Sequence, residues 1–280
     1  MKVHHLNCGT MRPFGGALID GRRVDGRKSV FRAATLVCHV LLLETDDGLV
    51  LVDSGLGVDD VRTPGPTLAR HWRLLSRPVL DERETALRQV EALGYRARDV
   101  RHVVLTHLDL DHGGGLRDFP HARVHVLAEE LDAALSPGKK AGDRTRYPDA
   151  QWAHGPEWVT HEPHGEPWFG FDGVREFRPD VLLVPLIGHT RGHTGVAVRT
   201  GDRWLLHAGD AYFHHSEPTA EPHCPPGLTF LQGRMDTVRE LRLSNQDRLR
   251  ELVGRHGDRV DVFCAHDAVE LERHQHRAAR

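Results

Sequence analysis

The chain has 280 residues, of which 39% are hydrophobic, and its 37 Lys and Arg residues nearly balance its 40 Asp and Glu residues. This composition is typical of a globular protein and excludes the disordered class. The sequence shows no apolar run of about 18 residues that could span a membrane and no apolar segment of a secretory signal at its start, so we expect a cytoplasmic protein without a membrane partner. The net charge of −3 argues against a nucleic-acid partner.

Cysteine and histidine set further limits. The four cysteines lie far apart without a CxxC pair, which predicts free thiols rather than a disulfide framework or a thiolate zinc site. The 22 histidines are unusually many for this length. Histidine is the commonest metal ligand, although we expect most of these side chains to be solvated.

The first half of the chain alternates strands and helices. Residues 34–53 contain two apolar runs separated by Asp46, Asp47 and Gly48, which predicts a hairpin of buried strands in a sheet that is covered on both faces. Residues 81–95 have apolar side chains at helical spacing and are followed by a strand that ends at Thr106. A further strand is expected at 122–127, with a short helix after it.

Residues 136–180 are rich in Pro, Gly, His and Trp and show no sustained period, so we expect an irregular insertion or lid there. Its aromatic side chains either line a pocket or attach the insertion to the body. Three strands follow at 181–187, 195–200 and 203–209, then a helix from about 235 to 252 and a last strand that ends at 266. We expect one domain over 1–280. Whether two copies of the chain form a homodimer stays open.

The segment THLDLDHGGG at 106–115 carries the strongest chemical signal. It places His107, Asp109, Asp111 and His112 directly after an apolar strand. In an extended segment residues two apart project to the same side, so the first three of these side chains could point to one place while His112 points to a neighbouring one. The three glycines would let the backbone bend sharply and approach a cation. A polar loop with a capping Asp would explain only one of the carboxylates.

Three later segments each place one potential ligand after an apolar strand. They are His189 in GHTRGHTG, Asp210 in HAGDAYF and His266 in FCAHD. A single histidine after a strand is weak evidence for a ligand. Because all three follow the first cluster in a fixed order along the chain, the whole set is much stronger evidence for a metal site than any one of these residues.

This series resembles the metallo-β-lactamase superfamily of hydrolases, whose motifs are HxHxDH, a His in a GHTPGH-like turn, an Asp in a GD turn and a C-terminal His. The resemblance covers roughly residues 36–266 and includes LVDSG at 51–55. It implies an α/β fold of the four-layer αββα sandwich type with a site for two divalent metal ions, here called the first and second cation positions. The implied ligands of the first position are His107, Asp109 and His189. Those of the second position are Asp111, His112 and His266, and Asp210 would bridge the two.

Some supporting residues remain open. Asp53 either orients an imidazole or is simply a turn residue at a strand end. His193 either supports the site or is exposed to solvent. We expect His207, His214 and His215, which flank the Asp210 turn, to be ordinary solvated histidines.

Asp109 departs from the family pattern, because the second ligand of HxHxDH is usually His. A carboxylate here makes the site less positive, so it should acidify its water less. It is also a harder ligand than imidazole, which shifts the preference from zinc toward manganese or iron without excluding zinc. The flavo-diiron branch of the superfamily is similar in carrying Glu at this position. A mononuclear enzyme that uses only the second position is the alternative.

Within the superfamily the chain is most similar to the group that contains N-acyl-homoserine lactonases, because of its length, the GHTxGHxG form and the closing FxxHD. This resemblance implies hydrolysis of a small ester or lactone by a metal-bound hydroxide at a dinuclear site. Asp111 would relay a proton to the leaving alkoxide, and Tyr212 is a candidate donor to the oxyanion. Lactonases carry a Tyr at the position of Phe213, so packing is the alternative role for Tyr212.

Other functions on the same fold stay open. One is thioester hydrolysis of the glyoxalase II type, and another is an iron-dependent redox or persulfide dioxygenase-type reaction. A non-catalytic metal-binding protein is a third. A serine acyl transferase is not expected, because the chain has no GxSxG motif.

Overall fold

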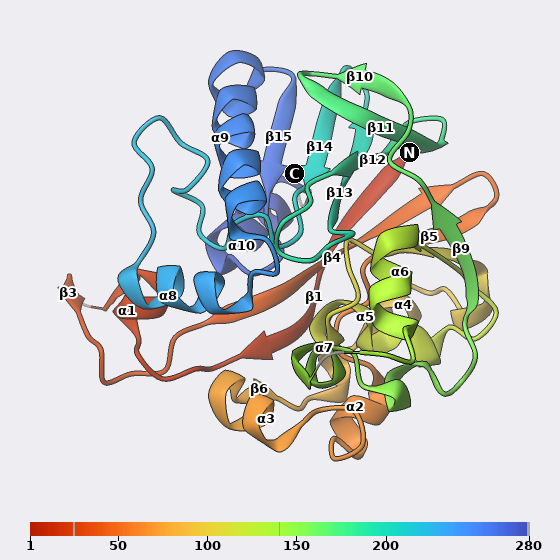
Figure 1. Cartoon of the computed structure of the whole chain (residues 1–280), viewed down its shortest axis with the longest axis horizontal. Helices are drawn as coiled ribbons and strands as arrows, with labels where there is room; N and C mark the ends of the chain where they lie inside the picture. The colour runs from red at the N-terminus through yellow and green to blue at the C-terminus, as the bar shows by residue number, and fades with distance from the viewer. Residues whose placement is uncertain (25, 140, 279–280) are drawn as a thin grey trace. The chain divides into compact units, whose positions relative to one another are not determined.

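A computed structural model describes residues 1–24, 26–139 and 141–278 of the chain. The chain forms two compact units. The first unit comprises Met1–Met11, Val37–His161 and Leu271–Arg280, and the second comprises Arg12–Leu36 and Glu162–Glu270. Figure 1 shows the elements of both units.

The first unit is built on a mixed sheet with the strand order β6-β1-β4-β5-β7-β8-β9. β4 and β5 form the antiparallel hairpin predicted from the sequence, with Leu41 opposite Val52, while β5, β7, β8 and β9 run parallel. The strands of this sheet are β1 (Lys2–Met11), β4 (Leu36–Thr45), β5 (Gly48–Val52), β6 (Pro78–Val79), β7 (Val100–Val104), β8 (Arg123–Leu127) and β9 (Glu157–His161). The predicted strands at 34–53, before Thr106 and at 122–127 are therefore confirmed.

Helices of the first unit cover the apolar core of this sheet, which includes Leu42, Leu51, Val103 and Val124. The predicted helix at 81–95 is shorter than expected, because residues 82–84 form a 3-10 turn and the Thr85 side chain caps the helix that begins at Ala86. The helices are α2 (Val58–Arg62), α3 (Arg70–Ser76), α4 (Ala86–Ala92), α5 (Leu110–Gly113), α6 (Ala128–Leu135), α7 (Ala141–Arg146) and α10 (Ala268–Ala278), the last of which begins in the second unit.

The second unit has a sheet with the strand order β10-β11-β12-β13-β14-β15, antiparallel except for the parallel pair of β14 and β15. Its strands are β10 (Glu166–Trp168), β11 (Phe171–Arg178), β12 (Val181–Pro185), β13 (Thr194–Thr200), β14 (Arg203–His207) and β15 (Val260–Phe263), and a separate hairpin joins β2 (Arg23–Val24) to β3 (Arg27–Lys28). Its helices are α1 (Ala17–Asp20), α8 (Pro226–Met235) and α9 (Arg239–His256). α9 contacts β15, as Figure 1 shows in blue, and its apolar residues Leu249 and Leu252 join the core.

The segment at 136–180, expected to be irregular, contains regular structure over much of its length. β9 extends the first sheet, and β10 and β11 form an edge of the second. Most of the Pro and Gly residues of this segment stand outside its strands. The short strands are defined more by hydrogen bonds to neighbouring strands than by their own periodicity. The prediction of a single domain stays a prediction.

Among the described helices, none combines the length and the apolar character needed to cross a membrane. Within the described part of the chain, Cys8, Cys38, Cys224 and Cys264 are not joined in disulfides.

Candidate metal centre

The first group of predicted ligands follows β7 in the first unit. Asp109 is in an extended conformation, and its carbonyl accepts the N–H groups of His112 and Gly113 at 3.0 and 2.9 Å, which starts α5. Asp111 and His112 therefore lie in a helical turn. The expectation that strand-like alternation aims Asp111 beside His107 is wrong, because the chain is extended only as far as Asp109.

Asp53 organises the histidines of this segment. It has a φ of 61°, and its carboxylate accepts hydrogen bonds from the Thr106 N–H at 2.7 Å and the Thr106 hydroxyl at 2.9 Å. His112 Nδ1 donates to the same carboxylate at 2.8 Å. Because one ring nitrogen of His112 is held in this way, Nε2 is the nitrogen that can serve as a ligand. Of the two roles left open for Asp53, the structure supports the orientation of an imidazole.

His107 and its neighbours present ligand atoms close together. The ring centroids of His107 and His112 are 4.0 Å apart, and His107 Nε2 lies 3.4 Å from Asp109 Oδ2. Asp111 places a carboxylate oxygen within 4.8 Å of Cys38 Sγ. All four predicted ligands of the first unit are buried.

The glycine run at 113–115 has a packing role. A Cβ on Gly114 would lie 2.4 Å from Asp60 Oδ2 and 2.7 Å from the Gly55 carbonyl oxygen, so only glycine fits there. The φ of Gly114 is −62°, an ordinary helical value. The expected sharp bend is therefore not the reason for this glycine. Glycine is required because the backbone at this position approaches the turn after Asp53 closely.

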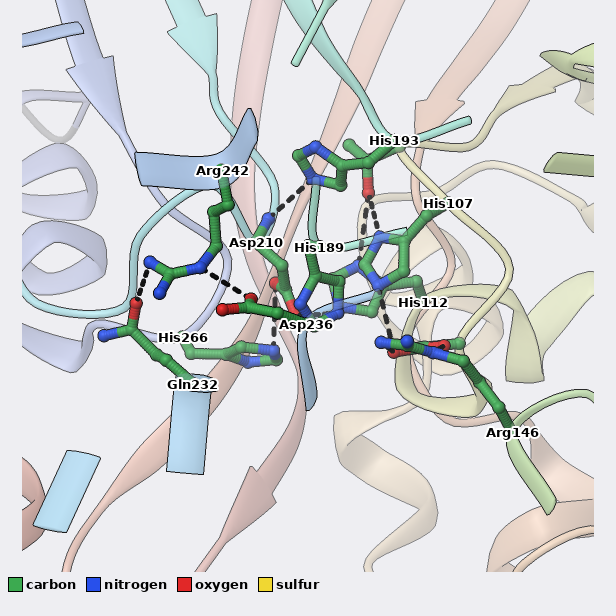
Figure 2. A network of polar contacts seen from close by, with 12 residues as sticks. His107, His112, Arg146, His189, His193, Asp210, Gln232, Asp236, Arg242 and His266 are labelled. Carbon is green, nitrogen blue, oxygen red and sulfur yellow. Dashed lines mark hydrogen bonds and ion pairs between the residues drawn. The ribbon is translucent and has the colours of Figure 1, made fainter. Parts of the chain in front are cut away.

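Arg146 is a component of this candidate site that the sequence does not predict. Its Nε and Nη2 atoms donate to Asp109 Oδ1 and Oδ2 at 2.5 and 2.8 Å, a bidentate contact. Burial works to lower the pKa of Arg146, but the adjacent Asp109 carboxylate raises that pKa above its usual value. Arg146 and His107 can both be followed in Figure 2. No motif in the sequence signals this pairing, since it joins residues 37 positions apart.

The second unit brings the three later predicted ligands together. His189 follows β12, Asp210 follows β14, and His266 follows β15. His189 Nε2 lies 3.3 Å from Asp210 Oδ2, and His266 Nε2 lies 3.1 Å from Asp210 Oδ1. Figure 2 shows the contact between His266 and Asp210. Each oxygen of the Asp210 carboxylate thus has a different imidazole beside it, and all three side chains are buried.

His193 positions Asp210. Its Nε2 accepts a hydrogen bond from the Asp210 N–H at 2.9 Å, so its Nδ1 carries the proton and donates to the Leu186 carbonyl, also at 2.9 Å. The contact with Asp210 is drawn in Figure 2. Since His193 is fully buried, the solvent-exposed alternative is wrong.

Polar residues of α9 hold two of the three loops that carry predicted ligands in the second unit. Asn245 donates to the Ile187 carbonyl at 2.7 Å, and Gln246 donates to the Ala211 carbonyl at 3.0 Å. These contacts explain why α9 buries polar side chains on one face. They fix the backbone next to His189 and Asp210.

The Tyr212 hydroxyl donates to Glu270 Oε1 at 3.0 Å, within the apolar core of the second unit. Burial and the Glu270 charge raise the pKa of Tyr212 above its usual value. The structure therefore supports the packing alternative for Tyr212. Phe213 is the neighbour that lies beside the predicted ligands, with its ring centroid 6.0 Å from that of His189 and 4.9 Å from that of His266.

The histidines that flank the Asp210 turn are less exposed than expected. His207 and His214 are buried, and burial and the neighbouring His215 lower the pKa of His214 to about 4. His215 Nδ1 donates to Asp267 Oδ2 at 2.8 Å, and Asp267 Oδ1 accepts from the Val269 N–H at the start of α10. The prediction that all three are solvated is wrong, because His207 and His214 are buried and His215, whose side chain is 36% exposed, attaches this turn to the start of that helix.

The spacing of the ligand atoms fits divalent cations. In the three imidazole–carboxylate pairs described above, nitrogen and oxygen lie 3.1–3.4 Å apart. Ligand bonds of about 2.1 Å in a tetrahedral site place neighbouring ligand atoms about 3.4 Å apart. Imidazole together with carboxylate is a donor set that suits zinc, manganese and iron.

The chain belongs to the metallo-β-lactamase superfamily, because the sequence pattern described as "Metallo-beta-lactamase superfamily" matches residues 34–254. A probable metallo-hydrolase of Mycobacterium tuberculosis is 46% identical over 271 residues, which cover 95% of this chain and 80% of that protein. The N-acyl homoserine lactonase AttM of Rhizobium johnstonii is 29% identical over 81% of this chain and 80% of its own length.

A solved structure shares the fold. The chain is similar to a crystal structure of an AiiA variant from B. thuringiensis with N-decanoyl-L-homoserine bound at its active site, with a TM-score of 0.67, 22% identity and coverage of 97% of this chain and 95% of that one. The predicted metallo-β-lactamase fold is confirmed, and so is the prediction that the chain is a metallo-hydrolase.

Proposed function

We propose that this metallo-hydrolase cleaves a small ester or lactone and uses two divalent cations. The first cation position would comprise His107, Asp109 and His189, and the second Asp111, His112 and His266, with Asp210 shared between them. The observation that carries this proposal is that His189 and His266 approach different oxygens of the Asp210 carboxylate, at 3.3 and 3.1 Å. This is the arrangement that a bridging carboxylate requires.

When bound, the two cations would activate a water molecule and polarise the carbonyl of the substrate. The chain itself would orient the reaction. Asp53 holds the His112 ring, and His193 holds the Asp210 backbone. Asp111 would carry a proton to the leaving alkoxide, since a carboxylate close to the reacting group can act as a general acid and base.

A relative of the chain and the position of Phe213 both indicate the class of substrate. The Rhizobium johnstonii relative is named an N-acyl homoserine lactonase, which favours a lactone. The Phe213 ring beside His189 and His266 offers an apolar contact and no proton, so it favours an uncharged substrate. Tyr212 takes no part in this proposal, because its hydroxyl is bound to Glu270.

The test is an assay of the purified protein loaded in turn with zinc, manganese and iron. The panel is a series of homoserine lactones, aryl esters and S-lactoylglutathione. We expect turnover of a lactone or ester with at least one metal. Turnover of S-lactoylglutathione alone would replace the proposal with thioester hydrolysis. If no substrate of the panel turns over while a persulfide drives oxygen consumption, the hydrolytic proposal is wrong.

The shared role of Asp210 has its own test. Asp210→Ala should lose both cations, measured as metal equivalents per chain by equilibrium dialysis at a fixed free metal concentration. Asp202→Ala, which changes an exposed aspartate in a turn, should retain them and serves as the control. Two equivalents retained in Asp210→Ala would refute the bridging role.

A further inference from the structure

The carboxylate at the unusual ligand position, Asp109, is held by a guanidinium. Arg146 Nε lies 2.5 Å from Asp109 Oδ1 and Nη2 lies 2.8 Å from Oδ2, so both oxygens are engaged. The Arg146 side chain is 17% exposed and that of Asp109 is 8% exposed. Because water screens such a pair poorly, the positive charge of Arg146 acts strongly on its surroundings.

The surrounding residues build this pairing into the fold. Glu130 is fully buried, and its Oε1 accepts hydrogen bonds from the Leu108 N–H at 2.9 Å and the Tyr147 hydroxyl at 3.0 Å. Leu108 and Tyr147 are the chain neighbours of Asp109 and Arg146. One buried carboxylate therefore fixes both segments, and the contact between Arg146 and Asp109 is not an accident of two surface side chains.

The guanidinium stands next to a cation ligand. Asp109 Oδ2 accepts from Arg146 Nη2 and also lies 3.4 Å from His107 Nε2. A cation bound by His107 and Asp109 would therefore share this oxygen with a permanent positive charge. The guanidinium repels the cation and draws electron density from the carboxylate, and both effects weaken binding. Asp210, in contrast, has imidazole nitrogens beside its two oxygens.

We propose that Arg146 makes the two cation positions unequal, so that the first position, with His107 and Asp109, binds its cation much more weakly than the second. The protein would then hold one tightly bound cation and one that exchanges readily. This inference rests on the proposed function, because it needs both positions to exist. It assigns Arg146 a positioning role that acts through Asp109.

The experiment is a titration of metal-free protein with zinc in competition with a chromophoric chelator. We expect two binding steps in the wild-type protein, with dissociation constants that differ by 100-fold or more. Arg146→Met removes the charge and retains an unbranched side chain, so it should tighten the weaker step by at least 10-fold and leave the stronger step unchanged. Two equal steps in the wild-type protein, or a weaker step that Arg146→Met does not tighten, would overturn the inference.

Two further variants separate charge from other effects. Arg146→Lys keeps the charge, so its weaker step should stay weak. Arg144→Met removes an exposed arginine of the same helix, whose Nε donates to the Lys139 carbonyl, and should leave both steps unchanged. Tightening of the weaker step in either variant would contradict the charge argument.

Asp109→Asn covers the case in which Arg146→Met does not fold. It should abolish the weaker step and change the stronger one by less than threefold. Loss of the stronger step would mean that Asp109 serves the tight position, and the inference would fail. A protein that binds no zinc at all would instead refute the proposed function, so the two failures can be told apart.

Discussion

Single hydrogen bonds decide what the ring nitrogens of this site can do. His112 uses Nδ1 to bind Asp53, and His193 uses Nδ1 to bind the Leu186 carbonyl. In each ring the remaining nitrogen is therefore directed elsewhere, toward a ligand position in His112 and toward the Asp210 N–H in His193. The same residue type thus serves as a ligand candidate in one place and as a support in the other.

Asp53→Asn tests the first of these contacts. Asn tolerates the positive φ of this position, so the turn should persist. The contact with His112 Nδ1 should weaken, and we expect metal affinity to fall by roughly 10- to 100-fold, as for other groups that orient a ligand. Chelator competition measures the affinity, and the thermal midpoint reports whether the fold is retained. An affinity equal to that of the wild-type protein would contradict the role of Asp53.

Tyr212→Phe tests the choice between packing and catalysis. The substitution removes the hydrogen bond to Glu270, which still accepts from the Cys264 N–H at 2.8 Å. We expect the free energy of unfolding to fall by about 1–2 kcal/mol, measured by urea denaturation, and kcat/KM to change less than twofold. A 100-fold fall in kcat in a stably folded variant would show instead that the hydroxyl acts in the reaction.

At the scale of elements, each group of proposed ligands depends on contacts that hold the backbone of the neighbouring loop. In the first unit the glycines after α5 pack against the turn that follows Asp53, and in the second unit Asn245 and Gln246 of α9 bind the carbonyls of the ligand loops. These contacts fix backbone positions, so the proposed ligand side chains would need little further ordering when a cation binds.

Gly114→Ala tests the close approach in the first unit. The added methyl would meet Asp60 Oδ2 and the Gly55 carbonyl, so we expect a loss of about 1–3 kcal/mol in the free energy of unfolding. Gly254→Ala is the matched control, since it lies in α9 with no atom within 4 Å of the new Cβ. It should stabilise the protein by about 0.5–1 kcal/mol. Equal effects of the two substitutions in urea denaturation would refute the packing argument.

The elements also show where sequence patterns reach their limit. The hairpin of β4 and β5 was predictable because its apolar residues are nearly continuous and its turn contains Asp46, Asp47 and Gly48. β9, β10 and β11 were not, because their alternation is weak and hydrogen bonds to neighbouring strands define them. The start of α4 was placed too early, since the cap at Thr85 competes with the helical pattern before it.

At the scale of the whole molecule, the proposed ligands come from segments spread between residues 107 and 266. A cation that binds them only in the folded state stabilises that state by mass action, by about 4 kcal/mol at a free concentration 1,000 times its dissociation constant. The proposal therefore links activity to stability.

Removal of the metal tests this link. Dialysis against a chelator should abolish hydrolysis and lower the thermal midpoint by about 10 °C, given a shift of 2–4 °C per kcal/mol for a protein of this size. Return of zinc or manganese should restore both quantities. The measurements are calorimetry and a lactone assay on the same samples. A midpoint that does not move although metal analysis shows complete removal would argue against a metal centre that joins these segments.

The amino-acid sequence by itself determined the fold class and the candidate ligands. Imidazoles and carboxylates that directly follow apolar strands form a local pattern, and that pattern carried the family resemblance. Only the tertiary structure decided which partner each of these groups has. Arg146 binds Asp109 across 37 positions, Asp53 binds His112 across 59, and Tyr212 turns to Glu270 instead of toward the ligands. Such pairings depend on how distant segments approach one another, which local propensity does not encode.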